Sequence, residues 1–444
     1  MIPIKPNWSE EMTIQAKTTR HHLVWSRVLM PALVFIMLAS ATGQAQELRK
    51  EGRYYVTEIK RNFTVQPAGT LEMSGIQGDI DISVWPKNEV QIIERMRMDV
   101  YTEEEAKRAL EETKASYRQS GDRIIVGGLE RSRDWIQSDF QISVPATFNL
   151  DVSTSGGNIS ARQIKGTARL RTSGGDVTLI ETGGNIRATT SGGNIIVRDS
   201  EGDVEVKTSG GDLELERIKG LLTGATSGGN ITLRGASKDV RLRTSGGDVE
   251  IFDTDGSVNA STSGGNVRVE NVRGRVDVST SGGDVDLRNI KQEVEASTSG
   301  GDVEAMGLSA PARLRTSGGD VQARDVQASI DAATSGGDVD VEFTLKDFTK
   351  PHVITLKSSG GSVTLAIPEK LPANIFAEIR LGDGRWFSRE RYDISSDFPL
   401  KIQREEEDRR EGRYIRGEGQ INGGGDPITL TTSAGNITIR KLVR

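Results

Sequence analysis

The sequence contains no cysteine, only three histidines and few aromatic residues, and each shortage excludes a class of protein. Without cysteine the chain has no disulfide, thiol nucleophile, zinc–thiolate site or lipidated N-terminal cysteine. Two histidines, His21 and His22, lie close to the N-terminus, which leaves His352, expected at the surface, as the one histidine for catalysis in the rest of the chain. Hydrophobic residues make up 35% and aromatic residues 5% of the 444, so a wide globular core is not expected. The 57 basic and 63 acidic residues lack the basic excess of a nucleic-acid-binding protein.

An apolar run over residues 28–41 follows several basic residues and ends in small ones. It is shorter than the roughly 20 residues that a transmembrane helix needs. The pattern predicts a signal peptide over residues 1–45, cleaved after Ala45, with Ala41 as the alternative site. The protein is therefore expected to be exported, to the periplasm or the cell surface. It would contact the membrane only if the leader stays uncleaved as an anchor.

The motif Ser-Gly-Gly recurs with an 18-residue period from Ser155 to Ser335, and a weaker period of nine divides each repeat. Each half consists of a three-residue turn and a six-residue strand. In the strand Asp203–Thr208, the second, fourth and sixth residues face inward and the others face solvent. One such coil buries too little apolar surface to be stable alone, so coils must stack. The sequence thus predicts an all-β, single-chain β-solenoid with 18-residue coils.

The two corners of each coil differ in sequence. One corner carries Thr before Ser-Gly-Gly in nearly every coil, which predicts an inward column of hydroxyl groups that cap the corner by hydrogen bonds. The Gly-Gly pair is expected to supply positive φ angles. The other corner varies, as at Ile164 and Leu308, which predicts an edge that packing does not fix. That edge is the better candidate for a specific contact.

The regular coils divide the mature chain into three regions. Residues 46–148 hold degenerate coils and a helical cap, in which Thr102–Glu105 is a capping box that opens an amphipathic helix over the end of the stack. Residues 149–343 form the regular β-solenoid. Residues 344–444 contain further coils, a loop and a β cap, and Pro427–Arg440 repeats the coil pattern in the same register.

Three segments resemble a known family. The repeated T-S-G-G-D-V, the SSGGSVTLAIP segment that begins at Ser358 and the NGGG before PITLTTSAGNI are similar to the bacterial putative-adhesin family of β-strand-repeat proteins. The resemblance extends from about residue 60 to the end of the chain. It implies an exported, non-enzymatic solenoid, and it brings no catalytic or cofactor-binding residues with it.

We therefore expect an adhesion or envelope-scaffold module whose partner is a cell-envelope protein or glycan. Two alternatives remain open. One is a periplasmic signalling or envelope-stress accessory protein, which the sequence does not separate from an adhesion module. The other is a glycan-active β-helix enzyme, for which Asp284/Asp286 and Asp338/Asp340 are the tightest carboxylate pairs.

The outward residues give the two predicted sheets different charges. The sheet after the Ser-Gly-Gly corner carries 9 Asp and 6 Glu against 6 Arg, and the opposite sheet carries 8 Arg and 1 Lys against 4 Asp and 3 Glu. On the acidic sheet, one outward column alternates Asn with Asp and then ends in four consecutive aspartates, spaced by about 5 Å: Asp284, Asp302, Asp320 and Asp338. Such a stack is a candidate for weak divalent-cation binding. The alternative is that each Asp caps backbone amides at its corner, and no other cofactor is expected.

Overall fold

A computed structural model describes residues 47–128, 135–381, 392–405 and 413–442, which belong to one compact unit, Gln44–Arg444. The predicted leader and its cleavage site lie outside these residues.

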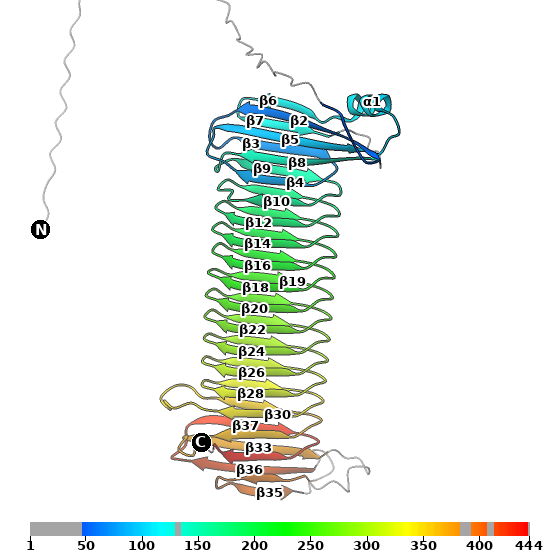
Figure 1. The fold of residues 1–444 in the computed structure, drawn as a ribbon. Coiled ribbons are helices and arrows are strands. Elements are labelled where there is room, and N and C mark those ends of the chain that lie inside the picture. Colours follow the sequence, from blue (N-terminus) through cyan, green and yellow to red (C-terminus); the bar gives the residue numbers. More distant parts are fainter. Residues whose placement is uncertain (1–46, 129–134, 382–391, 406–412, 443–444) are drawn as a thin grey trace, which may run out of the picture. The chain divides into compact units, whose positions relative to one another are not determined.

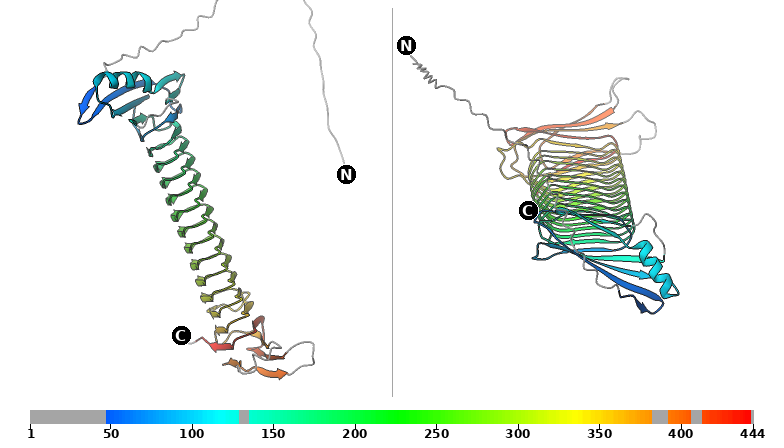
Figure 2. Two further views of the ribbon diagram at one scale, coloured as in Figure 1. Left: turned by 90° about the vertical axis from the view of Figure 1, so that its right-hand side faces the viewer. Right: turned by 90° about the horizontal axis from the view of Figure 1, so that it is seen from above.

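Each regular coil contributes one strand to each of two facing sheets, as the two views of Figure 2 show. Consecutive coils stack in parallel along the solenoid (Figure 1). Their strands pair with an 18-residue offset, so that Val177 lies beside Ile195 and Ile186 beside Val204. These ladders confirm the predicted solenoid. The halves are unequal, however, because strands of the first sheet typically have six residues and those of the second sheet four.

The first sheet contains β10 (Ile159–Arg162), β12 (Val177–Thr182), β14 (Ile195–Ser200), β16 (Leu213–Ile218), β18 (Ile231–Ala236), β20 (Val249–Thr254), β22 (Val267–Val272), β24 (Val285–Ile290), β26 (Val303–Leu308), β28 (Val321–Val326) and β30 (Val339–Phe343). The second sheet contains β9 (Asn149–Thr154), β11 (Ala168–Arg171), β13 (Ile186–Thr189), β15 (Val204–Lys207), β17 (Leu222–Ala225), β19 (Val240–Arg243), β21 (Val258–Ser261), β23 (Val276–Ser279), β25 (Val294–Ser297), β27 (Ala312–Arg315) and β29 (Ile330–Ala333).

The Ser-Gly-Gly corner is held by the threonine column. The hydroxyl of Thr244 donates to the carbonyl oxygen of Gly229 in the preceding coil at 2.8 Å and accepts the N–H of Gly247 at 3.3 Å. The same pair of bonds recurs from coil to coil, for example at Thr172 and Thr298. The predicted capping role of these hydroxyls is confirmed.

The reason for glycine at this corner differs from the expected one. None of the glycines in the regular Ser-Gly-Gly corners has a positive φ angle. Instead, a Cβ atom on the second glycine, such as Gly247, would collide with the carbonyl group of the equivalent glycine in the preceding coil. Glycine is needed there because two main chains pass in contact.

The opposite corner turns on a single left-handed residue. The residues of this column have φ angles of 51–82°: Gln163, Glu181, Asp199, Arg217, Gly235, Asp253, Asn271, Asn289, Gly307 and Asp325. Each reverses the in–out alternation, so that the next residue turns inward; Ile164, Ile218 and Leu308 are completely buried. The expectation that packing leaves this edge free was therefore wrong.

Antiparallel strands finish the N-terminal end of the stack. The first sheet continues from β10 through β4 (Ile80–Val84) and β8 (Ile136–Val144) to β5 (Glu89–Met98), β2 (Tyr54–Thr64) and β1 (Arg49–Glu51). The second continues from β9 through β3 (Thr70–Ile76) and β7 (Arg123–Gly127) to β6 (Ser116–Ser120). The parallel coil pattern expected of this region holds for β3 and β4 and for β7 and β8 stacked on them, whereas β5, β2, β1 and β6 pair antiparallel.

Helix α1 (Glu103–Thr113) begins with the predicted capping box, in which Thr102 accepts the N–H of Glu105 and the Glu105 carboxylate accepts that of Thr102. Its buried residues, such as Leu110, pack on Met96 and Met98 of β5 in a small core separate from that of the coils. The helix therefore covers a face of the terminal strands rather than the solenoid core itself. Beside it, burial raises the pKa of Glu94, although the Tyr117 hydroxyl donates a hydrogen bond to its carboxylate.

The C-terminal segment inserts between two earlier coils. Strands β37 (Asp426–Thr432) and β38 (Ile437–Lys441) stack on β31 (Ile354–Lys357) and β32 (Val363–Ile367), in the predicted register. Strands β33 (Ala373–Leu381) and β34 (Ile394–Ser396) then pair with the opposite edges of β37 and β38, respectively. The second sheet ends in antiparallel β36 (Arg413–Ile421) and β35 (Lys401–Glu405). The last segment of the chain thus ties together elements that lie well before it in the sequence.

The corner geometry predicts that neighbouring glycines differ in their tolerance of a methyl group. Gly247→Ala should lower the free energy of unfolding by about 1–3 kcal/mol, because its Cβ meets the main chain of the preceding coil. Gly246→Ala is the matched control: its Cβ lies 3.4 Å from the nearest atom, and it should be neutral or stabilising by up to about 1 kcal/mol. Urea unfolding of both variants measures the difference, and equal destabilisation would contradict the close-approach explanation.

The two buried threonine environments predict opposite effects of one substitution. The hydroxyl of Thr254, at the left-handed corner, is buried without a hydrogen-bond partner among the described residues. Thr254→Val should therefore stabilise the protein by about 1 kcal/mol, whereas Thr244→Val, which breaks two hydrogen bonds, should destabilise it by about 1–3 kcal/mol. Thermal melting of the two variants provides the comparison, and a loss of stability in both would show that Thr254 has a partner after all.

Candidate functional site

A shallow groove runs along the second sheet, parallel to the axis of coil stacking. It lies between two columns of outward side chains, which occupy the residue just before each strand and the second residue of the strand. Three recesses form it, and they share lining residues: the first ends at Leu221 and Thr223, where the second begins, and the second reaches Arg275, where the third begins. From Asn149 to Thr355 the recesses follow consecutive coils, so they form one continuous surface feature.

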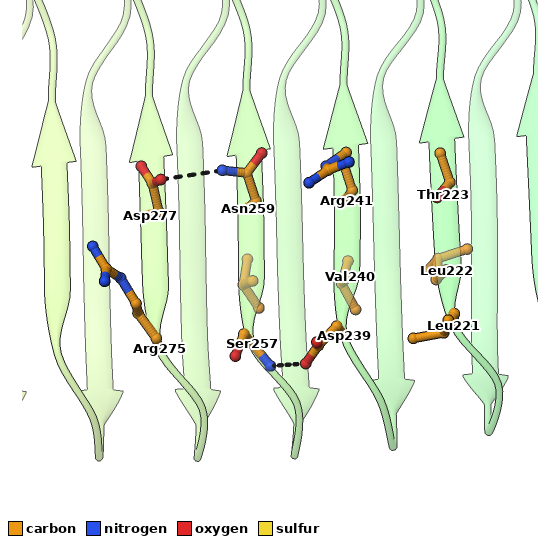
Figure 3. A pocket seen from close by; sticks show the side chains of 11 residues that line it. Leu221, Leu222, Thr223, Asp239, Val240, Arg241, Ser257, Asn259, Arg275 and Asp277 are labelled. Carbon is orange, nitrogen blue, oxygen red and sulfur yellow. Dashed lines mark hydrogen bonds between the residues drawn. The ribbon is translucent and has the colours of Figure 1, made fainter.

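Figure 3 shows the central part of the groove, with Leu221, Asp239, Ser257 and Arg275 in one column. The groove floor consists of the strand backbone over buried residues such as Val240, which is 3% exposed. The width between the columns is the two-residue spacing of a strand, about 6.6 Å. A groove of this width, open along its length, suits an extended chain rather than a compact small molecule.

Charged side chains in the groove mostly pair between neighbouring coils. Arg187 lies 2.9 Å from Glu205, and Arg275 lies 3.3 Å from Glu293. These pairs are exposed, so each contributes at most about 1 kcal/mol to stability. Their main effect is to balance charge locally along the groove, which also contains hydroxyl and amide groups such as those of Thr223, Ser257 and Asn259.

The predicted aspartate column lies on the first sheet, at the Ser-Gly-Gly corner. Each carboxylate accepts the backbone N–H of the next coil through Oδ1: Asp284 from Asp302 at 2.9 Å, Asp302 from Asp320 at 2.7 Å, and Asp338 from Ser362 at 2.7 Å. The asparagines of the column accept the same bond, as Asn266 does from Asp284 at 2.8 Å. The capping role that sequence analysis gave as the alternative is thus present in the structure.

No three His, Asp or Glu side chains converge as a metal site anywhere in the described part of the chain. The cation hypothesis for Asp284, Asp302, Asp320 and Asp338 stays a prediction. Because Oδ1 of each is engaged with the main chain, a cation would have to rely on Oδ2.

Replacing two of these aspartates separates capping from charge. In the variant Asp302→Asn/Asp320→Asn the amide oxygens accept the same N–H groups, and stacked charges about 5 Å apart are removed. We expect an unchanged or higher melting temperature at low salt, whereas Asp302→Ala should lower it. A rise in melting temperature with millimolar calcium, beyond that of matched monovalent salt and confined to the wild type, would instead favour the cation site.

His352 was expected at the surface, but it is only 4% exposed. Its Nδ1 lies 2.9 Å from the carbonyl oxygen of Lys350 and its Nε2 lies 2.8 Å from that of Pro372. Its backbone N–H donates to Asp426 at the start of β37. The residue thus joins three segments of the C-terminal region, and both ring nitrogens lie within hydrogen-bond distance of main-chain carbonyl groups.

Three of the four aspartates considered for glycan hydrolysis also have structural partners. Asp286 lies 3.0 Å from Arg288, while Asp284 and Asp338 accept backbone N–H groups. Both pairs stand on regular strands of the first sheet, whereas the groove lies on the second. The structure therefore does not place them in the groove.

No helix in the described residues is both long enough and apolar enough to cross a membrane.

Comparison with known proteins identifies the architecture. The family model described as Toastrack DUF4097 matches residues 77–305 and 253–440. A crystal structure of a "putative cell adhesion protein" from Clostridium sporogenes is similar at 7% identity and a TM-score of 0.15, over 87% of this chain and 100% of that one. No curated protein matches the chain.

Two further crystal structures are of proteins described as a "putative adhesin". The one from Bacteroides fragilis has 13% identity and a TM-score of 0.15, over 69% of this chain and 95% of that one. The one from Parabacteroides merdae has 13% identity and a TM-score of 0.23, over 68% and 100%. Identities and scores this low carry no argument about binding or activity.

Proposed function

The chain belongs to the Toastrack DUF4097 family, which confirms the resemblance seen in the sequence, and from this premise we propose that it is an exported, non-enzymatic adhesion or envelope-scaffold module. In this proposal it binds an extended cell-envelope polymer along the groove of the second sheet. The observation that carries the proposal is the continuity of that groove over consecutive coils.

The absence of a catalytic role is part of the proposal. The sequence has no cysteine, and the two ring nitrogens of His352 are occupied by main-chain carbonyl groups. General acid–base chemistry would then depend on carboxylates, and three of the four paired aspartates on the first sheet, Asp284, Asp286 and Asp338, contact arginine or backbone amides. These features favour binding over the glycan-active enzyme.

Export rests on the apolar run over residues 28–41 and its basic flank. A solenoid without disulfides depends on its coil-to-coil hydrogen bonds, which need no oxidising compartment and tolerate one. A periplasmic signalling or stress accessory role is the alternative, and it too would need a partner on an outward face.

The groove is tested by replacing one threonine on each sheet with tryptophan. Thr223→Trp places a large side chain where two recesses meet, and it should weaken binding of the protein to isolated envelope polysaccharide by tenfold or more. Thr232→Trp on β18 is the matched control, because it adds the same side chain to the outward face of the first sheet. Binding is measured by biolayer interferometry on immobilised polysaccharide. Equal affinity of the two variants, or loss of binding in the control alone, would refute the groove as the binding surface.

A further inference from the structure

The second sheet repeats one basic motif at long range. The sequence Arg-Leu-Arg occurs three times, at a constant interval of four coils, or roughly 19 Å along the stack. The three copies are Arg169–Arg171, Arg241–Arg243 and Arg313–Arg315, on β11, β19 and β27. In each copy the leucine is buried and the first arginine lines the groove.

Each of the outer two copies forms ion pairs with an acid on a neighbouring coil, through Arg169 alone in the first copy and through both arginines in the third. Arg169 lies 3.7 Å from Asp151, which is its partner in the preceding strand. Asp331, on the strand after β27, pairs with both Arg313, at 3.7 Å, and Arg315. Where an acid lies on a neighbouring coil, the arginines of the motif therefore form ion pairs with it.

The middle copy has no such partner. Arg241 stands between Thr223 and Asn259, as Figure 3 shows, and Arg243 stands between Ala225 and Ser261. Neither guanidinium group forms an ion pair with any residue that the structure describes, and both are exposed.

Among the described residues, Asp239, the nearest acid in sequence, forms no ion pair with Arg241 or Arg243. Asp239 precedes Arg241 by two residues, and its Oδ1 accepts the backbone N–H of Ser257 at 2.9 Å. Asn259 occupies the position that Asp331 holds beside the third copy of the motif. The middle of the groove thus presents Arg241 without an ion-pair partner among the described residues, and Arg243, equally unpaired, lies next to it just outside the groove; Thr223, Asn259 and Ser261 lie beside them.

We propose that Arg241 and Arg243 form an anion-binding subsite for the carboxylate groups of an acidic polysaccharide that lies in the groove. The inference rests on the proposed binding function and names its ligand class. Side by side on one strand, about 7 Å apart, the two arginines leave room for one carboxylate between their guanidinium groups. Charge-assisted hydrogen bonds from arginine to a carboxylate are among the stronger polar contacts available at a surface.

The surroundings favour a polysaccharide over other polyanions or a peptide. The strand N–H and C=O groups beneath the groove are used in the parallel ladders, so a peptide strand cannot pair with this face. A nucleic acid carries a phosphate at every nucleotide and would need a longer basic track than one arginine pair. Hydroxyl and amide side chains such as Thr223, Ser257 and Asn259 match the hydroxyl groups of a sugar chain. The acidic first sheet repels the same ligand, which directs it to the second sheet.

The test uses polygalacturonate as the anionic probe and its fully methyl-esterified form as the neutral one, in calorimetric titrations of the protein at low ionic strength. We expect the wild type to bind the acidic polymer at least tenfold more tightly than the ester. The variant Arg241→Ala/Arg243→Ala should lose this preference. Arg268→Ala/Arg288→Ala removes the same charge from the first sheet and should retain it.

Two further variants exchange an acid and an amide beside the motif, so they test the subsite without removing an arginine. Asn259→Asp gives the middle motif the acid that the third copy has, and it should weaken binding as the arginine variant does. Asp331→Asn uncovers Arg313 and Arg315, and it should raise the number of polygalacturonate sites per chain from one to two.

The outcomes separate this inference from the proposed function. Equal binding of acidic and esterified polymer, with both lost in Thr223→Trp, would overturn the anion subsite and leave the groove as the binding surface. Binding of the acidic polymer that Thr223→Trp leaves unchanged would overturn both. If the variant Asn259→Asp still bound polygalacturonate more tightly than the methyl ester, Arg241 and Arg243 would not be the groups that recognise the carboxylate.

Discussion

The contact between main chains at the Ser-Gly-Gly corner is the constraint on which the rest of the solenoid depends. The second glycine of each corner lies so close to the carbonyl group of the preceding coil that no side chain fits there. The threonine hydroxyl then bridges the same two coils, with bonds of 2.8 and 3.3 Å at Thr244. Because both contacts join residues of adjacent coils, each coil fixes the height and the register of the next, and the regular period of the sequence follows.

A fixed frame of this kind separates stability from recognition. The buried residues, the corner threonines and the left-handed column repeat along the stack, so the outward positions are free to differ from coil to coil. Their side chains form straight columns, with neighbours about 4.8 Å apart. A residue in a column therefore has two chemical neighbours, which are the equivalent residues of the coils before and after it. Arg241 and Arg313 have the same backbone setting, and they differ because one lies beside Asn259 and the other beside Asp331.

The periodicity was sufficient to predict the fold, because the constant spacing of Ser-Gly-Gly and the in–out alternation of the strands together define the coil. It predicted the inward residues, the threonine column and the register of the last coil, which pairs Ile354 with Ile428. It gave the wrong reason for the glycines, since a repeat shows that a residue type is required without showing whether conformation or space requires it. The left-handed column was missed because Glu181 and Arg217 are residue types that rarely adopt positive φ. Burial of His352 depends on Pro372 and Asp426, which are distant in sequence, and no local pattern signals such a contact.

The sequence was sufficient to predict the composition of the candidate site but not the ion pairing of its charged residues. The surplus of arginine on the second sheet follows from counting the outward residues, and the sequence contains the Arg-Leu-Arg motif at all three positions. The net charge of a sheet, however, does not show which of its charged residues form ion pairs. Pairing is decided by residues one coil away, and that comparison isolates β19 from β11 and β27. A single arginine pair without ion-pair partners, at the edge of a long groove, has a further consequence for recognition. Equal sites on every coil would let a polymer slide by one coil without loss, whereas one charged centre fixes the register of an anionic chain against the stack.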